Sequence, residues 1–169
     1  LSGIDGRLLE GRRKPALRIR EGGKTKILHD EFSGVIEKVN PGVLSAVMEA
    51  GFVAVIAPQA ISYESVALNV DGDRAAAAIA ATLGAETLVI LTNVPGLLRD
   101  VEDETSLIRE IPRGQADDYL ERYAGGRMKR KMLGAAEALR SGVGRVILAD
   151  GRVEQPVLKA LAGQGTVIQ

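Results

Sequence analysis

The sequence contains no cysteine and no tryptophan, and it has one histidine, two phenylalanines and three tyrosines among 169 residues. Without cysteine, neither a disulfide framework nor a cysteine-ligated zinc cluster can form, which fits a reducing compartment such as the cytoplasm. The few aromatic side chains offer little surface on which bases could stack, so we expect no nucleic-acid partner. No apolar run approaches the roughly 18 residues of a membrane span, and no signal peptide opens the chain, so we expect no membrane partner.

The formal net charge is zero, but the charges are distributed unevenly. Eight lysines and arginines stand against four acidic residues in the first thirty positions, and a second basic cluster, RMKRK, covers 127–131. This asymmetry favours an acidic partner, either a small molecule or a protein, and the alternative is a solvated basic hairpin. His29 lies in this basic region beside Asp30. Because there is no second histidine and no cysteine, we interpret His29 as a surface residue rather than a metal ligand.

Short apolar and polar runs alternate over residues 7–38, which predicts a β-hairpin with Gly22-Gly23 at its turn. Asn40-Pro41 then predicts the start of a helix that ends before Gly51. The apolar run FVAVIA at 52–57 does not alternate, which is typical of a strand covered on both faces.

Helices and strands alternate in the rest of the chain. The pattern predicts helices at 73–84, within 115–141 and near 155–162, and strands at 87–92, 145–150 and 166–168. Such alternation indicates an α/β fold with a mostly parallel sheet and helices on both faces. Ligands of such folds bind beyond the carboxyl ends of the strands, so the chemistry is expected in the loops at 58–72, 93–105 and 150–155.

An asparagine and two aspartates surround one glycine in NVDGD, directly before an alanine-rich helix. The spacing resembles the start of a calcium loop, but Ala80 stands where such a loop requires a bidentate glutamate. Asp71 or Asp73 can cap the helix, and one acid suffices for a cap. We therefore interpret Asp73 as an organiser of lysines and a metal-bound nucleotide.

Two further stretches could bind a nucleotide. TNVPGLL at 92–98 follows a predicted buried strand, so a base or ribose could rest there, although an ordinary turn is the alternative. GGRMKRK at 125–131 opens a helix in which Lys131 rises from a face of small residues. A lysine in that place can reach a phosphoryl group as a point charge, and a solvated lysine is the alternative. No G-x-G-x-x-G follows a strand, so a dinucleotide-binding dehydrogenase is not expected.

Three segments together resemble, in order and spacing, the carboxyl-terminal half of the amino acid kinase family: ALNVDGDRAAAAIAATLGAETLVILTNVPGLL, GGRMKRKMLGAAEAL and GVGRVILADGRVEQPVLKALAGQGTVI. LSGIDGRLLEGRRK resembles the end of the family's amino-terminal half. The resemblance implies a three-layer αβα, carbamate kinase-like fold with a nucleotide-binding half and a β-hairpin segment. Residues 1–38 would end the amino-terminal substrate domain, and residues 39–169 would form the nucleotide-binding domain.

The resemblance also implies roles for individual residues. Asp73 and Lys131 would be catalytic, and Asn69 would contact the acyl substrate. The ATP-binding residues would be Thr92, Asn93, Val94, Pro95, Gly96, Leu97, Gly126 and Met128, with Mg²⁺ bound together with the nucleotide. Asn93 and Arg127 depart from the family, whose members often have aspartate and glycine there. The family's amino-terminal lysine and glycine-rich loops are absent from these residues, so we expect the chain alone to be inactive yet able to bind nucleotide.

Within the family the sequence is most similar to the acetylglutamate kinase group, and there to the branch that phosphorylates α-aminoadipate on the acidic amino-group carrier protein LysW. GRRK at 11–14 and GRMKRK at 126–131 are typical of that branch. The expected carrier contacts are Arg12, Arg13, Lys14, Lys129 and Arg130. Free N-acetylglutamate in arginine biosynthesis is the alternative acceptor, and a non-catalytic nucleotide-binding module is a third hypothesis. The resemblance further implies a homo-oligomer when the protein is complete.

Overall fold

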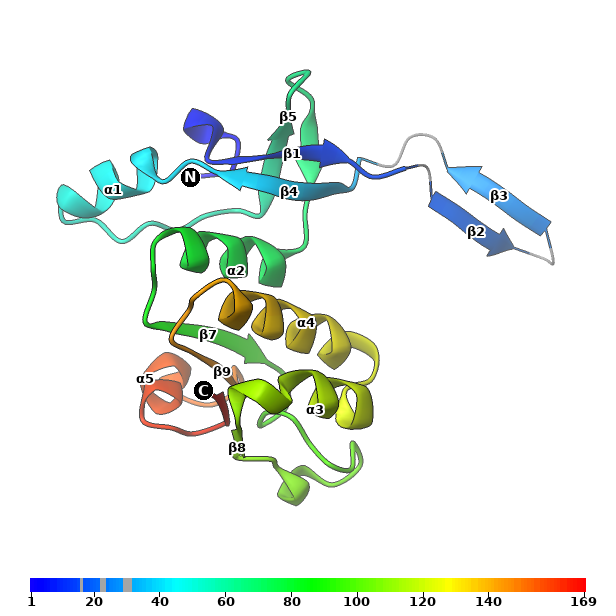
Figure 1. Cartoon of the computed structure of the whole chain (residues 1–169), viewed down its shortest axis with the longest axis vertical. Coiled ribbons are helices and arrows are strands. Elements are labelled where there is room, and N and C mark those ends of the chain that lie inside the picture. The colour runs from blue at the N-terminus through cyan, green and yellow to red at the C-terminus, as the bar shows by residue number, and fades with distance from the viewer. Residues whose placement is uncertain (16, 22–23, 29–31) are drawn as a thin grey trace. The chain divides into compact units, whose positions relative to one another are not determined.

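Two compact units, Leu1–Ala75 and Ala76–Gln169, make up the computed structural model of the chain (Figure 1). The structure describes residues 1–15, 17–21, 24–28 and 32–169. The boundary between the units falls within helix α2 (Gly72–Thr82). The separate division into domains at residue 38 stays a prediction.

The first unit contains a four-stranded mixed sheet. Its strands, in the order β4-β1-β5-β6, are β4 (Gly34–Val39), β1 (Leu9–Arg13), β5 (Gln59–Ser62) and β6 (Ala67–Asn69). β1 runs antiparallel to β4 and parallel to β5, and β5 and β6 are antiparallel. The one-turn helix η1 (Asp5–Arg7) precedes β1.

A separate antiparallel pair, β2 (Leu17–Glu21) and β3 (Lys24–Leu28), lies between β1 and β4 in the chain (Figure 1). It confirms the predicted hairpin, whose register runs from Leu17 opposite Leu28 to Glu21 opposite Lys24. The predicted turn at Gly22-Gly23 and the histidine at position 29 lie outside the described residues.

The segment 52–57 differs from its prediction. Helix α1 (Gly42–Glu49) ends where expected, but the apolar run after it belongs to no strand and is not buried. Phe52, Val53 and Val55 expose 68%, 91% and 79% of their surface. An unbroken apolar run predicts burial only where other chain covers both sides, and among the described residues the only bridge to this segment is that of Ser2 with Ala57. The prediction of a buried strand was therefore wrong for this chain.

The second unit is built on another mixed sheet, in the order β7-β9-β10-β8. Its strands are β7 (Thr87–Thr92), β9 (Arg145–Asp150), β10 (Thr166–Ile168) and β8 (Glu110–Ile111). β7 and β9 are parallel, from Thr87 opposite Arg145 to Thr92 opposite Asp150. The first three strands begin and end at the predicted residues.

β10 runs antiparallel to β9, which a regular alternation of strand and helix does not predict. The reason is the length of the connecting helix α5 (Pro156–Leu161), whose six residues rise only about 9 Å. A six-residue strand such as β9 is about 20 Å long, so α5 is too short to run back along the whole strand. The preceding helix α4 (Gly126–Arg140) has 15 residues and is long enough to make β7 and β9 parallel. The α/β class is confirmed, and its sheets are mixed.

Helices cover both faces of the sheet in the second unit. Val146 and Leu148 of β9 pack into a core with α4, with helix α3 (Ala116–Tyr123) and with the end of α2. Ile147 and Ala149, which alternate with them, pack against Ala160 of α5 on the other face. Short 3-10 turns η2 (Glu104–Ser106) and η3 (Arg113–Gln115) flank β8. No helix among the described residues is long and apolar enough to cross a membrane.

Candidate functional site

A cavity of about 420 Å³ lies where β7 ends and α4 begins, entirely within the second unit. Its volume falls within the range of small-molecule sites. It is lined by seven of the eight residues predicted to bind ATP: Thr92, Asn93, Val94, Gly96, Leu97, Gly126 and Met128. The eighth, Pro95, lines a second cavity instead. The folding of the chain thus brings together two segments that are about thirty residues apart in the sequence.

The 92–98 loop is anchored by one buried hydroxyl group. Thr166, which has no exposed surface, accepts a hydrogen bond from the amide of Leu97 at 2.8 Å and donates one to the carbonyl oxygen of Ile108 at 2.6 Å. Gly96 packs directly against it, since a Cβ at this position would lie 2.5 Å from Thr166 Oγ1 and 2.8 Å from Leu107 Cδ1. These contacts fix the backbone of the cavity's wall.

The opposite wall is the amino terminus of α4. Gly126, its first residue, has φ +50°, a left-handed conformation that favours glycine. No side chain of the described residues caps this terminus. Its first turn contains no acidic residue, and it contains the basic residues Arg127 and Lys129. Uncapped backbone amides and the positive end of the helix dipole favour an anion. The terminus therefore suits a phosphate group.

Five residues that were not predicted to bind ATP also line the cavity: Leu98, Val101, Tyr123, Gly125 and Arg127. Tyr123 ends α3 and stacks at an angle on Tyr119, with ring centroids 5.6 Å apart. Leu98, Val101 and Tyr123, together with Leu97 and Met128, form an apolar wall that suits a flat ring. The sequence could have indicated Tyr123 as a lining residue only by its position, two residues before Gly125-Gly126.

The two aspartates of the NVDGD segment have different roles at the start of α2. Asp71 accepts a hydrogen bond from the backbone amide of Arg74 at 3.1 Å, so it caps the helix. Asp73 lies half-buried in the first turn, and the cap does not require it. Asn69 is exposed at the end of β6. Lys131 is half-buried on α4 and belongs to the second unit, whereas Asp73 belongs to the first. The predicted roles of Asn69, Asp73 and Lys131 stay predictions.

The predicted carrier contacts fall into two groups, one in each unit. Arg12 and Arg13 are exposed at the end of β1, where Arg12 pairs with Glu37 at 2.7 Å and the guanidinium of Arg13 lies 4.4 Å from the centroid of the Phe32 ring. Lys14 follows them and is also exposed. The second group, Lys129 and Arg130, is exposed on α4.

The described residues contain no cluster of three or more histidine and acidic side chains that could hold a metal ion by themselves.

The sequence matches known proteins over nearly its whole length. The model of the amino acid kinase family matches residues 3–150. The chain is 55% identical over 168 residues to the [LysW]-aminoadipate kinase of Deinococcus radiodurans and 52% identical over 171 residues to that of Thermus thermophilus. It is 39% identical over 142 residues to the acetylglutamate kinase of Clostridioides difficile. These three matches include 99%, 100% and 82% of this chain. They include only 57%, 63% and 50% of the length of the respective relatives.

Solved structures with the same fold support this relationship. N-acetylglutamate synthase from Neisseria gonorrhoeae, solved with coenzyme A and L-arginine, matches 99% of this chain and 37% of its own with a TM-score of 0.78 and 29% identity. Carbamate kinase from Giardia lamblia bound to AMP-PNP matches 91% of this chain and 52% of its own with a TM-score of 0.68. The identity to the latter is 19%, so that match concerns the fold alone.

Proposed function

We propose that this chain, which belongs to the amino acid kinase family, is the nucleotide-binding part of a cytoplasmic kinase that phosphorylates a carboxylate with ATP. One observation carries the proposal. The 92–98 loop and the start of α4 enclose one cavity, and its lining includes seven residues expected at an ATP site.

The volume and the lining residues of the cavity support a bound nucleotide. The adenine would lie against the apolar wall of Leu97, Met128 and Tyr123, and the ribose against Thr92 and Asn93. The phosphates would extend toward the uncapped amides and basic residues at the start of α4. Mg²⁺, bound to the phosphate oxygens, would neutralise part of their charge.

The reaction would make an acyl phosphate. A carboxylate oxygen of the acceptor attacks the γ-phosphorus, the bond from this phosphorus to the bridging oxygen of the β-phosphate breaks, and ADP leaves with the electron pair. Lys131 would stabilise the charge on the transferred group as a fixed cation, and Asp73 would orient the lysines. Asn69 would hold the acceptor. Catalysis of this kind depends on positioning and electrostatics, without a covalent intermediate on the enzyme.

For the acceptor we propose α-aminoadipate carried by LysW, in lysine biosynthesis, because two relatives with this specificity in their names are 55% and 52% identical to the chain. An acidic carrier would be steered by Arg13, Lys14, Lys129 and Arg130. Arg12 would contribute less, since Glu37 already neutralises it. N-acetylglutamate is the second candidate, because an acetylglutamate kinase is 39% identical over 142 residues. We further propose that the complete enzyme is a homo-oligomer.

A chimera tests the activity directly. The chain would replace the matching part of the D. radiodurans kinase, and hydroxylamine would trap acyl phosphate formed from MgATP with either N-acetylglutamate or LysW-bound aminoadipate. We expect trapped product with the carrier. Product with the free acid alone would keep the carboxylate kinase and refute the carrier. ATP binding without product from either acceptor would favour a non-catalytic module.

Variants of the chimera test the roles of single residues. Lys131→Met should reduce kcat about 100-fold or more with little change in KM for ATP, because its interaction is strongest in the transition state. Asp73→Asn should reduce kcat while the midpoint of urea unfolding stays unchanged. The control is Arg122→Met, which removes an exposed charge of α3 that lines neither cavity and should retain kcat. Wild-type kcat in Lys131→Met would refute its catalytic role.

A further inference from the structure

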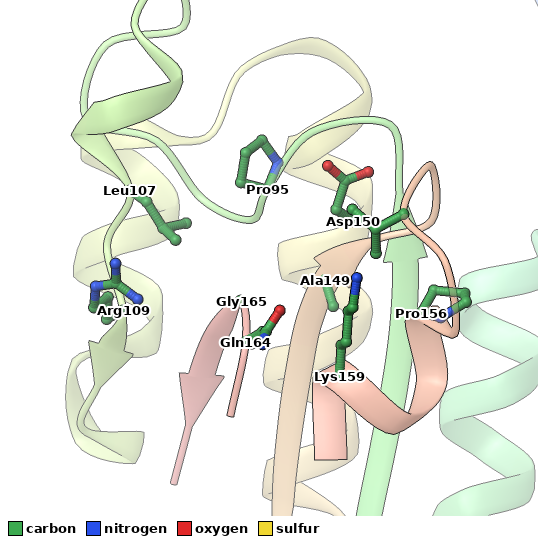
Figure 2. A pocket seen from close by; sticks show the side chains of 10 residues that line it. Pro95, Leu107, Arg109, Ala149, Asp150, Pro156, Lys159, Gln164 and Gly165 are labelled. Atoms are coloured by element: carbon green, nitrogen blue, oxygen red, sulfur yellow. The ribbon is translucent and has the colours of Figure 1, made fainter. Parts of the chain in front are cut away.

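A second cavity of about 420 Å³ lies in the second unit, and Pro95 of the 92–98 loop is one of its lining residues (Figure 2). Its walls come from the loop, from the segment before β8, from the end of β9, and from α5 and the residues after it. It lies at the carboxyl ends of the parallel strands β7 and β9, where α/β folds commonly bind ligands. The proposed phosphotransfer leaves this cavity without a role.

The cavity contains an acid that already has a cationic partner. The carboxylate of Asp150 accepts hydrogen bonds from Arg152 Nη2 at 2.8 Å and Nε at 2.9 Å, and Arg152 also pairs with Glu104 at 3.0 Å. The three side chains together carry one net negative charge. Asp150 is thus held in place at the rim by its own arginine, and it does not require a cation from the cavity.

Two cations of the cavity have no such partner. Arg109 and Lys159 make no ion pair within the parts of the chain that the structure describes. Figure 2 shows them on different elements, with the residues Gln164 and Gly165 between them. Lys159 is half-buried and Arg109 is exposed. A cation that lies partly against protein is stabilised by a counter-charge. An anion in the cavity would supply that charge.

Most of the remaining lining residues are apolar. Pro95, Leu107 and Ala149 line the space around the two cations, and Val153 and Pro156 continue it toward α5. An inorganic anion would leave this apolar surface in contact with water. A molecule with a hydrocarbon middle and a carboxylate at each end would satisfy both the surface and the charges.

We propose that the second cavity binds a short aliphatic dicarboxylate, with one carboxylate on Arg109 and the other on Lys159. The amide of Gln164 adds a hydrogen-bonding group between them. Because Pro95 lines this cavity while Val94 and Gly96 line the other, the 92–98 loop is a wall of both. A dicarboxylate that shifts this loop changes the affinity of the first cavity for nucleotide, and nucleotide changes the affinity for the dicarboxylate by the same factor.

Titration of the 169-residue chain with glutarate tests the site without nucleotide, so the result does not depend on the proposed kinase activity. We expect saturable binding in calorimetry, with shifted amide signals of Gly165, Gly151 and Lys159 in NMR spectra. Lys159→Met and Arg109→Met should each weaken binding about tenfold or more, since each removes one charge-assisted contact. Arg122→Met is the control, because Arg122 is exposed on α3 and lines neither cavity.

Two further ligands separate the alternatives. Glutaramide, which has the same length and no charge, should not bind, and inorganic phosphate should bind more weakly than glutarate. Equal binding of phosphate and glutarate would refute the preference for a dicarboxylate. Shifts of amide signals that are confined to Gly125 and Gly126 would place glutarate in the first cavity and refute the second site. Absence of saturable binding up to about 20 mM, a concentration at which even millimolar affinity is visible, would refute it as well.

Discussion

The hydroxyl group of Thr166 holds the amide of Leu97 at 2.8 Å, and so it joins a strand near the end of the chain to a loop 69 residues earlier. The same hydroxyl donates to the carbonyl oxygen of Ile108, and the group is completely buried. Two backbone groups, which would otherwise be left unpaired in the core, are satisfied by one side chain. The wall between the two cavities therefore depends on a residue that lines neither of them.

Thr166→Val should destabilise the chain and loosen this wall. The substitution keeps the shape of the side chain but leaves the Leu97 amide and the Ile108 carbonyl without a partner, which costs about 1–3 kcal/mol of unfolding free energy. Urea unfolding followed by circular dichroism measures the loss. Thr82→Val is the control, because the Thr82 hydroxyl bonds the carbonyl of Ala78 on an exposed part of α2. Equal stability of the two variants would show that the buried hydroxyl contributes nothing.

Gly96→Ala should weaken nucleotide binding. The new methyl group would lie 2.5 Å from Thr166 Oγ1 and 3.0 Å from its backbone nitrogen, so the loop must move away from β10. We expect at least a tenfold rise in the Kd for ATP or a fluorescent analogue, about 1.4 kcal/mol. Gly114→Ala is a matched control, since a Cβ there meets nothing within 4 Å. Unchanged affinity in Gly96→Ala would show that the nucleotide does not depend on this loop.

The pair of Asp150 and Arg152 should make stability depend on pH in the acid range. The hydrogen bonds that Arg152 donates to the carboxylate of Asp150 hold the pKa of Asp150 below its usual value. A lowered pKa contributes stability that is present above the unfolded pKa, near 4, and is lost as the pH falls through the folded pKa. The difference in unfolding free energy between wild type and Arg152→Met should therefore be present at pH 7 and smaller at pH 3. A difference that grows on acidification would contradict this coupling.

The exposed run at 52–57 should promote self-association of the isolated chain. Val53 and Val55 are 91% and 79% exposed, and an exposed apolar segment of this kind is prone to associate with other chains. The double variant Val53→Thr and Val55→Thr should reduce concentration-dependent association in sedimentation velocity without lowering the unfolding midpoint. Val66→Thr, at a position that is 38% exposed, serves as the control. Loss of stability in the double variant would show that the run is packed in solution.

The sequence predicted the strands of the second unit well because their signal is local. Thr87–Thr92 and Arg145–Asp150 are apolar runs bounded by glycine and polar residues, and helices cover both of their faces in the structure. The run at 52–57 has the same pattern, yet it is exposed in this chain. Periodicity shows that a segment is suited to burial, but whether it is buried depends on which other segments reach it.

The candidate site shows the same division between local and distant information. The 92–98 loop was predicted because turn residues at a strand end are a local feature, and Gly126 was predicted from the resemblance to the family. Tyr123 and Val101 were missed, since their place in the cavity depends on how α3 and the loop after Leu98 pack. The orientation of Pro95 toward the second cavity was likewise not predictable from TNVPGLL alone.

By itself, the sequence determined the α/β class, most helices and strands of the second unit, and the family. The reason is that hydrophobic periodicity, turn residues and the order of motifs are properties of the sequence itself. Only the tertiary structure decided that Thr166 anchors Leu97, that Arg152 joins Asp150 to Glu104, and that one loop separates two cavities. These contacts join residues up to 69 positions apart. Their formation depends on the packing of whole helices against the sheet, which no local pattern specifies.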